Sequence, residues 1–372
     1  MKELEDEERC HDRVDAFAAR ERYTGGMPPV RQRLGSLGLL LASFAMILAA
    51  SELAARLTWR DTGAARSVDP AAASAHADLP HLRTVSEAMR PGARGLFRDV
   101  LFETNRHGFR GPDVPVPKPR GSFRIVLIGD SVTMGGGVLR EDTYAARTER
   151  ALAGTHGALH IEVLNLGYAG LDAWGSLKRL HDVGLALEPD LIVYGFTLND
   201  IQGPYYRRTR DDGIEQLARA RADRSPSYTW RLLRPRLASL RELFDPPADS
   251  YVHELDENYF GNPDAFAHLV SALGTLARIS ADQGVCALVL IHTKLYYLHW
   301  LHPFRRHYDA IEQSARSYGL SVVQSLPYFM GEFGSELWQN PHNPHPNAEG
   351  HRILAQALVA GLGELPEVCW QH

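Results

Sequence analysis

Short apolar runs alternate with amphipathic segments over most of the chain after residue 95. The runs are rich in β-branched residues and lie at 123–128, 161–164, 191–196, 287–291 and 320–323. The segments between them have apolar residues at helical spacing and lie at 143–153, 173–185, 263–281 and 304–318. This alternation predicts a three-layer, doubly wound α/β fold, with a mostly parallel sheet covered by helices on both faces.

The longest apolar run lies near the N-terminus, outside this pattern. Leu34–Ser51 holds 18 residues without a charge, and as a helix it would span roughly 27 Å, close to the thickness of the bilayer hydrocarbon. We expect a transmembrane helix over 34–55. A cleaved signal segment is the alternative, because Ala49 and Ser51 are small enough for a cleavage site. A translation start at Met27 would make a transmembrane helix and a cleaved signal segment harder to tell apart.

The arginines that flank this segment weakly predict its orientation in the membrane. Four arginines precede it and three follow it within about 20 residues, which favours a cytoplasmic tail over 1–33. Residues 56–94 then form a linker, and 95–366 form a domain on the periplasmic side. The arginine-rich stretch 207–244 interrupts the alternation and predicts a helical insertion, with a cap over the site or a membrane-facing helix as alternatives.

Composition and cysteine content narrow the function classes. The 372 residues include 40 Lys and Arg against 45 Asp and Glu, a net charge of −5, so nothing favours nucleic-acid binding. Of Cys10, Cys286 and Cys369, Cys286 lies in an apolar run and is expected to be a buried small hydrophobic side chain. A Cys286–Cys369 disulfide is the less favoured alternative, because the sequence does not fix their separation.

Polar residues follow three of the predicted strands and precede the last predicted helix. They lie at 129–131 (GDS), 165–170 (NLGYAG), 197–200 (TLND) and 342–347 (HNPHPN). Ligands of such sheets bind beyond the carboxyl ends of the strands, so these residues should converge at one edge. A serine, a backbone N–H, a side-chain amide and a histidine together make an acyl-transfer site. A phosphate-binding loop does not fit, because no Gly-Lys-Ser/Thr follows the glycines after Ser131.

In order and strand context, these four segments resemble the sequence blocks of the SGNH/GDSL hydrolases. The resemblance covers roughly residues 121–362 and implies a flavodoxin-like sheet and esterase activity without a cofactor. The upstream ETNRHGFRG, the single anchor and the ending HPNAEGH resemble a membrane-anchored bacterial subgroup.

The resemblance also implies a role for each residue of the site. Ser131 would be the nucleophile, and His345 would be the general base that takes its proton. The oxyanion hole would consist of the backbone N–H groups of Ser131 and Gly170 and the side-chain amide of Asn199. A free serine hydroxyl is a poor nucleophile and needs an adjacent base, which agrees with these roles.

Two positions depart from the family pattern. Family members commonly have an aspartate two or three residues before the catalytic histidine, where this chain has Asn343 and His342. We therefore expect a Ser–His dyad helped by the Asn343 amide oxygen, rescue by a distant carboxylate, or loss of activity. Thr197 replaces the glycine of the third block.

Other polar residues are expected to have structural or surface roles. Asp130 and Asp200 should hold loop backbone through hydrogen bonds. The histidines form two loose groups, His342, His345 and His351, and His299, His302 and His307. No metal is expected, because neither a cysteine pair nor HExxH spacing is present, so these histidines should line a pocket or the surface.

The resulting hypothesis is a membrane-anchored serine esterase that removes or transfers O-acyl groups, with acetyl as the favoured group. Its partners would be an acylated small molecule or cell-envelope glycan and the inner membrane, with no nucleic acid. A catalytically impaired glycan-binding or assembly subunit is the main alternative. A membrane-surface lipid hydrolase that uses the 207–244 stretch is a third.

Overall fold

The chain divides into two compact units. The computed structural model describes residues 42–54, 56, 79–155, 157, 159–208, 227, 229, 251–340 and 343–371. In the first unit, 42–54 is helical and exposes large apolar side chains, namely Phe44, Met46, Ile47, Leu48 and Leu53. The start of the expected transmembrane helix, 34–41, lies outside the described residues. Within the described ranges, no helix is long and apolar enough to cross a membrane.

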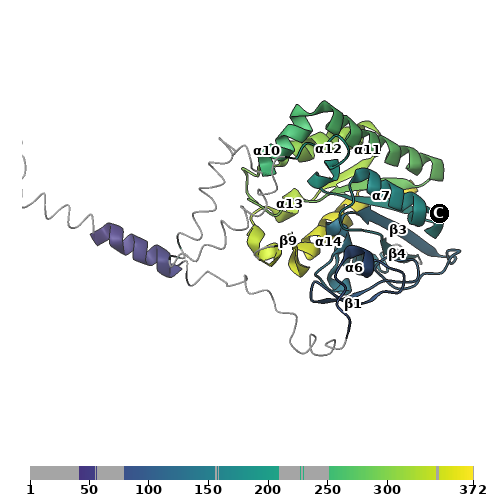
Figure 1. Cartoon of the computed structure of the whole chain (residues 1–372), viewed down its shortest axis with the longest axis horizontal. Helices are drawn as coiled ribbons and strands as arrows, with labels where there is room; N and C mark the ends of the chain where they lie inside the picture. The colour runs from purple at the N-terminus through teal and green to yellow at the C-terminus, as the bar shows by residue number, and fades with distance from the viewer. Residues whose placement is uncertain are drawn as a thin grey trace, which may run out of the picture. The chain divides into compact units, whose positions relative to one another are not determined.

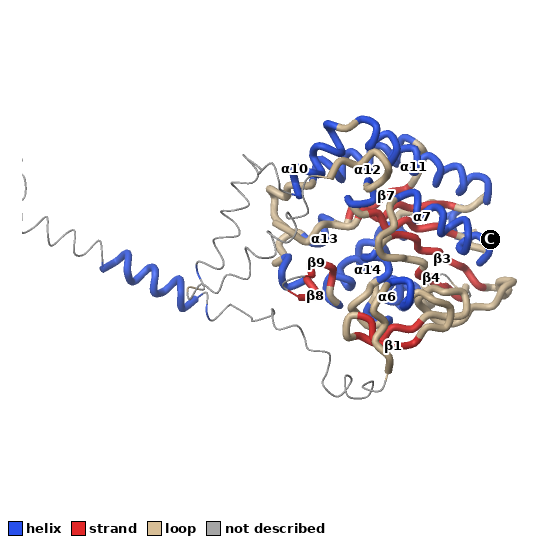
Figure 2. Tube along the Cα trace, viewed as in Figure 1, coloured by secondary structure: helices blue, strands red, loops and turns tan. Residues whose placement is uncertain are grey.

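A five-stranded parallel sheet forms the centre of the second unit. Its strands are β3 (Ser122–Gly129), β4 (His160–Asn165), β5 (Leu191–Phe196), β6 (Cys286–Ile291) and β7 (Ser321–Gln324). They confirm the five predicted apolar runs, with small shifts at the strand ends (Figure 2). Every residue of β5 is buried, as expected for a central strand covered on both faces.

Helices cover both faces of this sheet, which confirms the layered fold (Figure 1). One face carries α6 (Tyr144–Leu152) and α14 (Ala348–Gly363), which contact each other. The other carries α7 (Ala173–Arg179), α11 (Pro263–Gln283) and α12 (Arg305–Ser317). Helix α7 ends earlier than predicted, because the chain continues as a π turn over Leu180–Gly184 and a 3₁₀ turn over Leu185–Leu187.

The strand order β4-β3-β5-β6-β7 places a topological switch point beside β3. From β3 the chain crosses to β4 through α6 on one face, and from β4 it crosses to β5 through α7 on the opposite face. Such a reversal opens a crevice at the carboxyl ends of the two strands that flank it, here β3 and β5. Ser131 directly follows β3 and Asn199 follows β5, so both lie at this crevice.

Two small antiparallel pairs were not predicted. The hairpin of β1 (Arg94–Phe97) and β2 (Val100–Glu103) turns at two non-glycine residues with positive φ, a conformation that usually selects Asn-Gly. The second pair consists of β8 (Trp338–Asn340) and β9 (Asn343–Pro346). The histidine of the predicted site, His345, therefore lies on strand β9, which corrects the expectation of a loop before the last helix. Two prolines in β9 conceal that strand, because proline is depleted in strands.

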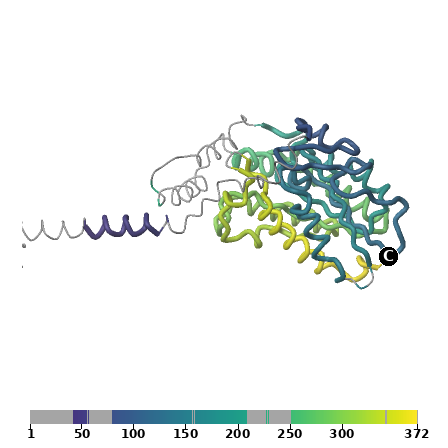
Figure 3. Tube along the Cα trace, turned by 90° about the horizontal axis from the view of Figure 1, so that it is seen from below, coloured from purple at the N-terminus to yellow at the C-terminus, as the bar shows by residue number. Residues whose placement is uncertain are grey.

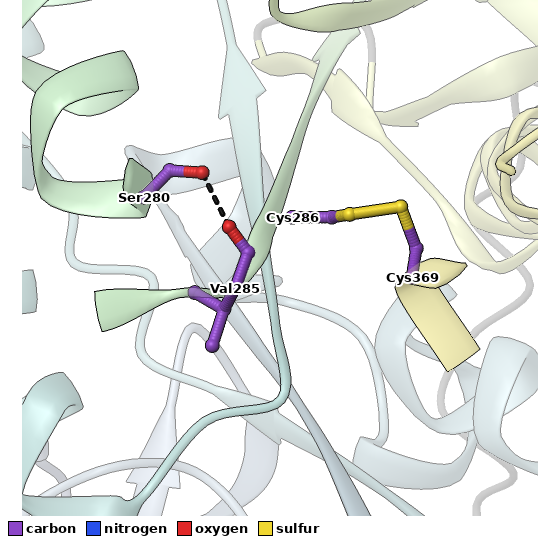
Figure 4. The surroundings of a disulfide bond; sticks show 4 residues. All are labelled: Ser280, Val285, Cys286 and Cys369. Carbon is purple, nitrogen blue, oxygen red and sulfur yellow. Dashed lines mark hydrogen bonds between the residues drawn. A yellow bond between two sulfur atoms is a disulfide. The ribbon is translucent and has the colours of Figure 1, made fainter. Parts of the chain in front are cut away.

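The expectation for Cys286 was wrong, because Cys286 and Cys369 form a disulfide (Figure 4). Cys286 begins β6, and Cys369 lies in the C-terminal 3₁₀ turn η7 (Glu367–Trp370), with 5.5 Å between the Cα atoms. The C-terminal end of the chain lies at the opposite end of the domain from β9 (Figure 3). The packing of α14 along the sheet returns Cys369 to the amino end of β6, a proximity over 83 residues that the sequence does not reveal.

Candidate active site

Ser131 lies at the sharp turn between β3 and the short helix α5 (Ser131–Met134). Asp130 caps this helix, and its Oδ1 accepts a hydrogen bond of 2.9 Å from the Val132 N–H. Gly129 has a φ of 150°, and a Cβ there would lie 2.5 Å from the Gly195 carbonyl oxygen. The turn therefore needs glycine before the Asp-Ser pair, which gives the GDS sequence a steric cause.

The structure brings Ser131 and His345 into direct contact. Ser131 Oγ lies 2.8 Å from His345 Nε2, across 214 positions of sequence. The other ring nitrogen, Nδ1, lies 2.5 Å from Asn343 Oδ1. Serine, imidazole and amide thus form the linear arrangement of a catalytic triad, with an amide where a triad has a carboxylate.

Gln339, on β8, fixes which atom of each amide faces its neighbour. Its Nε2 donates to the backbone carbonyls of Gly136 and Pro346, at 2.7 and 3.2 Å, and carbonyl oxygens only accept. Its Oε1 must therefore accept from Asn343 Nδ2, at 2.8 Å.

The orientation of the Asn343 amide determines the tautomer of His345. With its Nδ2 committed to Gln339, Asn343 presents Oδ1 to the imidazole, so Nδ1 of His345 carries the ring proton. Nε2 is then unprotonated and accepts from the Ser131 hydroxyl. Asn343 thereby selects the tautomer that a general base requires, without contributing a negative charge.

Burial and nearby cations weaken His345 as a base. The pKa of His345 is lowered to about 4, mainly by burial and also by the positive charges of Arg98 and Lys294, while Asp130 opposes them. A triad aspartate would raise this pKa, because it stabilises the imidazolium. The imidazole is therefore neutral, and able to accept a proton, throughout the neutral pH range.

Three hydrogen-bond donors follow the carboxyl ends of β3, β4 and β5. In the described part of the chain, the backbone N–H groups of Ser131 and Gly170 donate to no other residue. Gly170 has a φ of 86° and lies in the turn after β4. One N–H of the Asn199 amide donates to Asp130 Oδ2 at 3.0 Å, which leaves the second N–H available. These groups supply three donors of the kind that stabilise an oxyanion.

A buried network connects the loops after β3 and β5. Thr197 Oγ1 lies 2.9 Å from both Asp130 Oδ2 and Asp200 Oδ1, so the residue that replaces a family glycine binds the two acids together. Asp200 also accepts from the Thr197 N–H at 3.1 Å. Burial and the Asp130 carboxyl raise the pKa of Asp200 well above its usual range. The expectation that both aspartates hold loop backbone is confirmed.

Three of the five other histidines in the two predicted groups are core residues. For these three, the expectation of a place at a pocket or the surface was wrong. His302, His307 and His351 are buried, and burial lowers the pKa of each. No group of three metal-binding side chains exists within the described ranges. His342 and most of the predicted insertion at 207–244 lie outside those ranges.

Sequence reasoning missed three residues of this region, Gln339, Lys294 and Arg98. Lys294 follows β6 and donates to Asn199 Oδ1 at 2.6 Å. The end of the fourth apolar run was a usable signal for it, because strand ends converge at the site. Gln339 and Arg98 lie on the two unpredicted antiparallel pairs, so no spacing could have indicated them.

Comparison with known proteins identifies the class. The model of the GDSL-like lipase/acylhydrolase family matches residues 127–353, which contain every residue of the site described above except Arg98. The chain belongs to this SGNH/GDSL family and is a serine-type esterase or acyl hydrolase. No curated protein matches it.

Several solved structures resemble this chain at low identity. The acetyl xylan esterase AlAXEase is 14% identical, and the match covers 64% of this chain and 98% of that one, with a TM-score of 0.40. A catalytic mutant of the acetylxylan esterase Axe2 from Geobacillus stearothermophilus is 17% identical over 65% and 95%, with a TM-score of 0.41. TesA is 16% identical over 64% and 97%, with a TM-score of 0.39.

Proposed function

We propose that Ser131 and His345 carry out ester hydrolysis through an acyl-enzyme. The 2.8 Å contact between Ser131 Oγ and His345 Nε2 carries this proposal. Oγ attacks the ester carbonyl carbon as its proton passes to Nε2, and the tetrahedral oxyanion receives hydrogen bonds from the Ser131, Gly170 and Asn199 donors. His345 then gives the proton to the departing alcohol. Water, activated in turn by His345, releases the acid and restores the serine.

Among the three expectations for the missing aspartate, we infer a dyad assisted by Asn343. The 2.5 Å contact with His345 Nδ1 and the fixed orientation of the amide support this choice. A catalytically impaired binding subunit is not favoured, because nucleophile and base are in hydrogen-bonding contact. The low pKa of His345 predicts a weaker base, but one that is deprotonated at neutral pH.

The substrate that we propose is an O-acylated, extracytoplasmic glycan or a related ester, with acetyl as the favoured acyl group. The loop after β6 supports a sugar-sized ligand, because it begins at Lys294 in the site and exposes 75% of the Trp300 side chain. His302 holds this loop through Nδ1, 2.9 Å from the Tyr296 carbonyl oxygen. An exposed aromatic on a restrained loop offers a flat apolar surface for a ligand. If a sugar hydroxyl replaces water, the same residues transfer the acyl group.

We further propose that the domain is membrane-anchored and faces the periplasm. The Cys286–Cys369 disulfide supports an oxidising compartment, and the exposed apolar side chains of helix 42–54 support a lipid contact. Alkylation of whole cells tests the compartment. Both cysteines should react only after reduction, and free thiols at both in intact cells would contradict the location.

Hydrolysis of p-nitrophenyl acetate by the full-length chain tests the activity. Ser131→Ala should abolish turnover, because it removes the hydroxyl that attacks the ester carbonyl. Ser86→Ala is a matched control, since Ser86 is an exposed serine of the short helix α4 (Val85–Ala88) and its hydroxyl contacts Thr84. Turnover by Ser131→Ala at the wild-type rate would eliminate the proposed mechanism.

A further inference from the structure

Lys294 connects the loop after β6 to the oxyanion donors. Its backbone N–H donates to Tyr308 Oη at 2.7 Å, which fixes the start of the side chain. Its Nζ lies over the Tyr251 ring, 5.5 Å from the centroid, and donates to Asn199 Oδ1 at 2.6 Å. A bond this short is typical of a charge-assisted donor. These contacts hold the Lys294 side chain beside Asn199.

The Asn199 amide lies between opposite charges. Its oxygen faces the Lys294 ammonium, and its nitrogen faces Asp130 Oδ2 at 3.0 Å. A flipped amide would put its NH₂ group against the ammonium and its oxygen against the carboxyl, so both contacts would become repulsive. The amide therefore has one allowed orientation, and that orientation leaves one N–H unused.

We propose that Lys294 is a positioning residue that holds the Asn199 amide and polarises it toward the oxyanion of the reaction. This inference rests on the proposed esterase function. The ammonium draws electron density toward Oδ1, and this makes the remaining Asn199 N–H a stronger donor. The effect is large in a site shielded from water and needs no rearrangement when negative charge develops.

Two carboxyls near Lys294 favour its charged form. Burial lowers the pKa of Lys294, and the Asp130 and Asp200 carboxyls raise it and so oppose burial. The Thr197 hydroxyl is a neutral donor 3.1 Å from the same oxygen, Asn199 Oδ1, but it has closer acceptors in the two acids. Lys294 is therefore the main partner of the amide oxygen among the described residues.

The interaction acts in the transition state and not on the bound ester, since the substrate carbonyl is uncharged. Removing the charge should therefore lower kcat and leave KM nearly unchanged. Loss of one oxyanion donor typically costs about 100- to 1,000-fold in rate. A residue that acts through that donor should cost less, so we expect a decrease of about 10- to 100-fold for Lys294→Met.

A double-mutant cycle with p-nitrophenyl acetate tests this inference. Lys294→Met should lower kcat by that factor with KM within about twofold of wild type, and adding it to Asn199→Ala should cause no further loss. Lys294→Gln, which keeps a donor without the charge, should lose activity in the same direction. Lys178→Met, which removes an exposed lysine of α7 paired with Asp182, is the matched control and should retain wild-type kcat.

Wild-type kcat in Lys294→Met, or losses that multiply in the double variant, would overturn the inference. Lys294→Gln gives the same decision if the methionine variant does not fold. The proposed function fails separately, when the wild-type chain does not turn over the ester or Ser131→Ala does. If the wild-type enzyme depends on Ser131 but folded Lys294 variants keep wild-type kcat, the positioning role is refuted and the proposed function stands.

Discussion

Replacing Asn343 with aspartate should restore a charged triad and move the acid limb of the pH–rate profile. In the wild-type chain, His345 must lose its proton to act as a base, and its pKa is lowered to about 4 by burial and by the nearby cations. Activity should therefore stay high down to about pH 5 and decrease through about pH 4. The protonated form at lower pH cannot accept the serine proton.

The size of the change follows from the 2.5 Å contact between Asn343 Oδ1 and His345 Nδ1. A carboxylate there would attract the imidazolium by about 4 kcal/mol at an effective dielectric constant of about 20 and a charge separation of about 4 Å. One pKa unit corresponds to about 1.4 kcal/mol, so the pKa of His345 should rise by about 2–3 units. The acid limb should then lie near pH 6–7, and a stronger base should raise the plateau rate by about tenfold.

The assay is kcat/KM for p-nitrophenyl acetate from pH 4 to pH 8, with the full-length wild type and Asn343→Asp side by side. Gln283→Glu adds the same charge at an exposed position at the end of α11 and should leave the limb near pH 4. A limb that does not move in Asn343→Asp would refute the assigned contact. A wild-type limb already near pH 6.5 would refute the lowered pKa.

Two further predictions concern the groups around His345. Gln339→Leu removes the partner that orients Asn343, so the amide can turn and the wrong tautomer becomes populated. We expect kcat to fall by about 10- to 100-fold, less than the roughly 10⁴-fold loss seen when a triad histidine has the wrong tautomer. A wild-type kcat would argue against the orientation of Asn343 by Gln339. Arg98→Met removes a positive charge that lowers the pKa of His345, so the acid limb should move upward. A limb that moves downward would reverse the sign of that interaction.

The sequence predicted the central fold because its strands are buried on both faces and read as continuous apolar runs. Ser131 and Asn199 could be placed at one edge for the same reason, since both follow such runs. The β1–β2 hairpin was missed because its turn lacks the usual Asn-Gly. Strand β9 was missed because proline hides its periodicity, and with it the pairing that brings Gln339 beside Asn343.

Other parts of the site depend on tertiary packing that no spacing records. Lys294 reaches Asn199 across 95 positions, and the disulfide joins residues 83 apart. The pKa of His345 depends on burial and on the position of Arg98, which lies on another element. Residue types at strand ends can thus be found from sequence, whereas the groups that tune them need the assembled chain.

Covalent labelling of the full-length chain with a fluorophosphonate, followed by peptide mass spectrometry, tests directly whether His345 activates Ser131. We expect one adduct, on the peptide that contains Ser131, at neutral pH, with greatly slowed labelling in His345→Ala. A folded wild-type chain that acquires no adduct at Ser131, or that labels equally fast without the imidazole, would contradict a serine activated by His345.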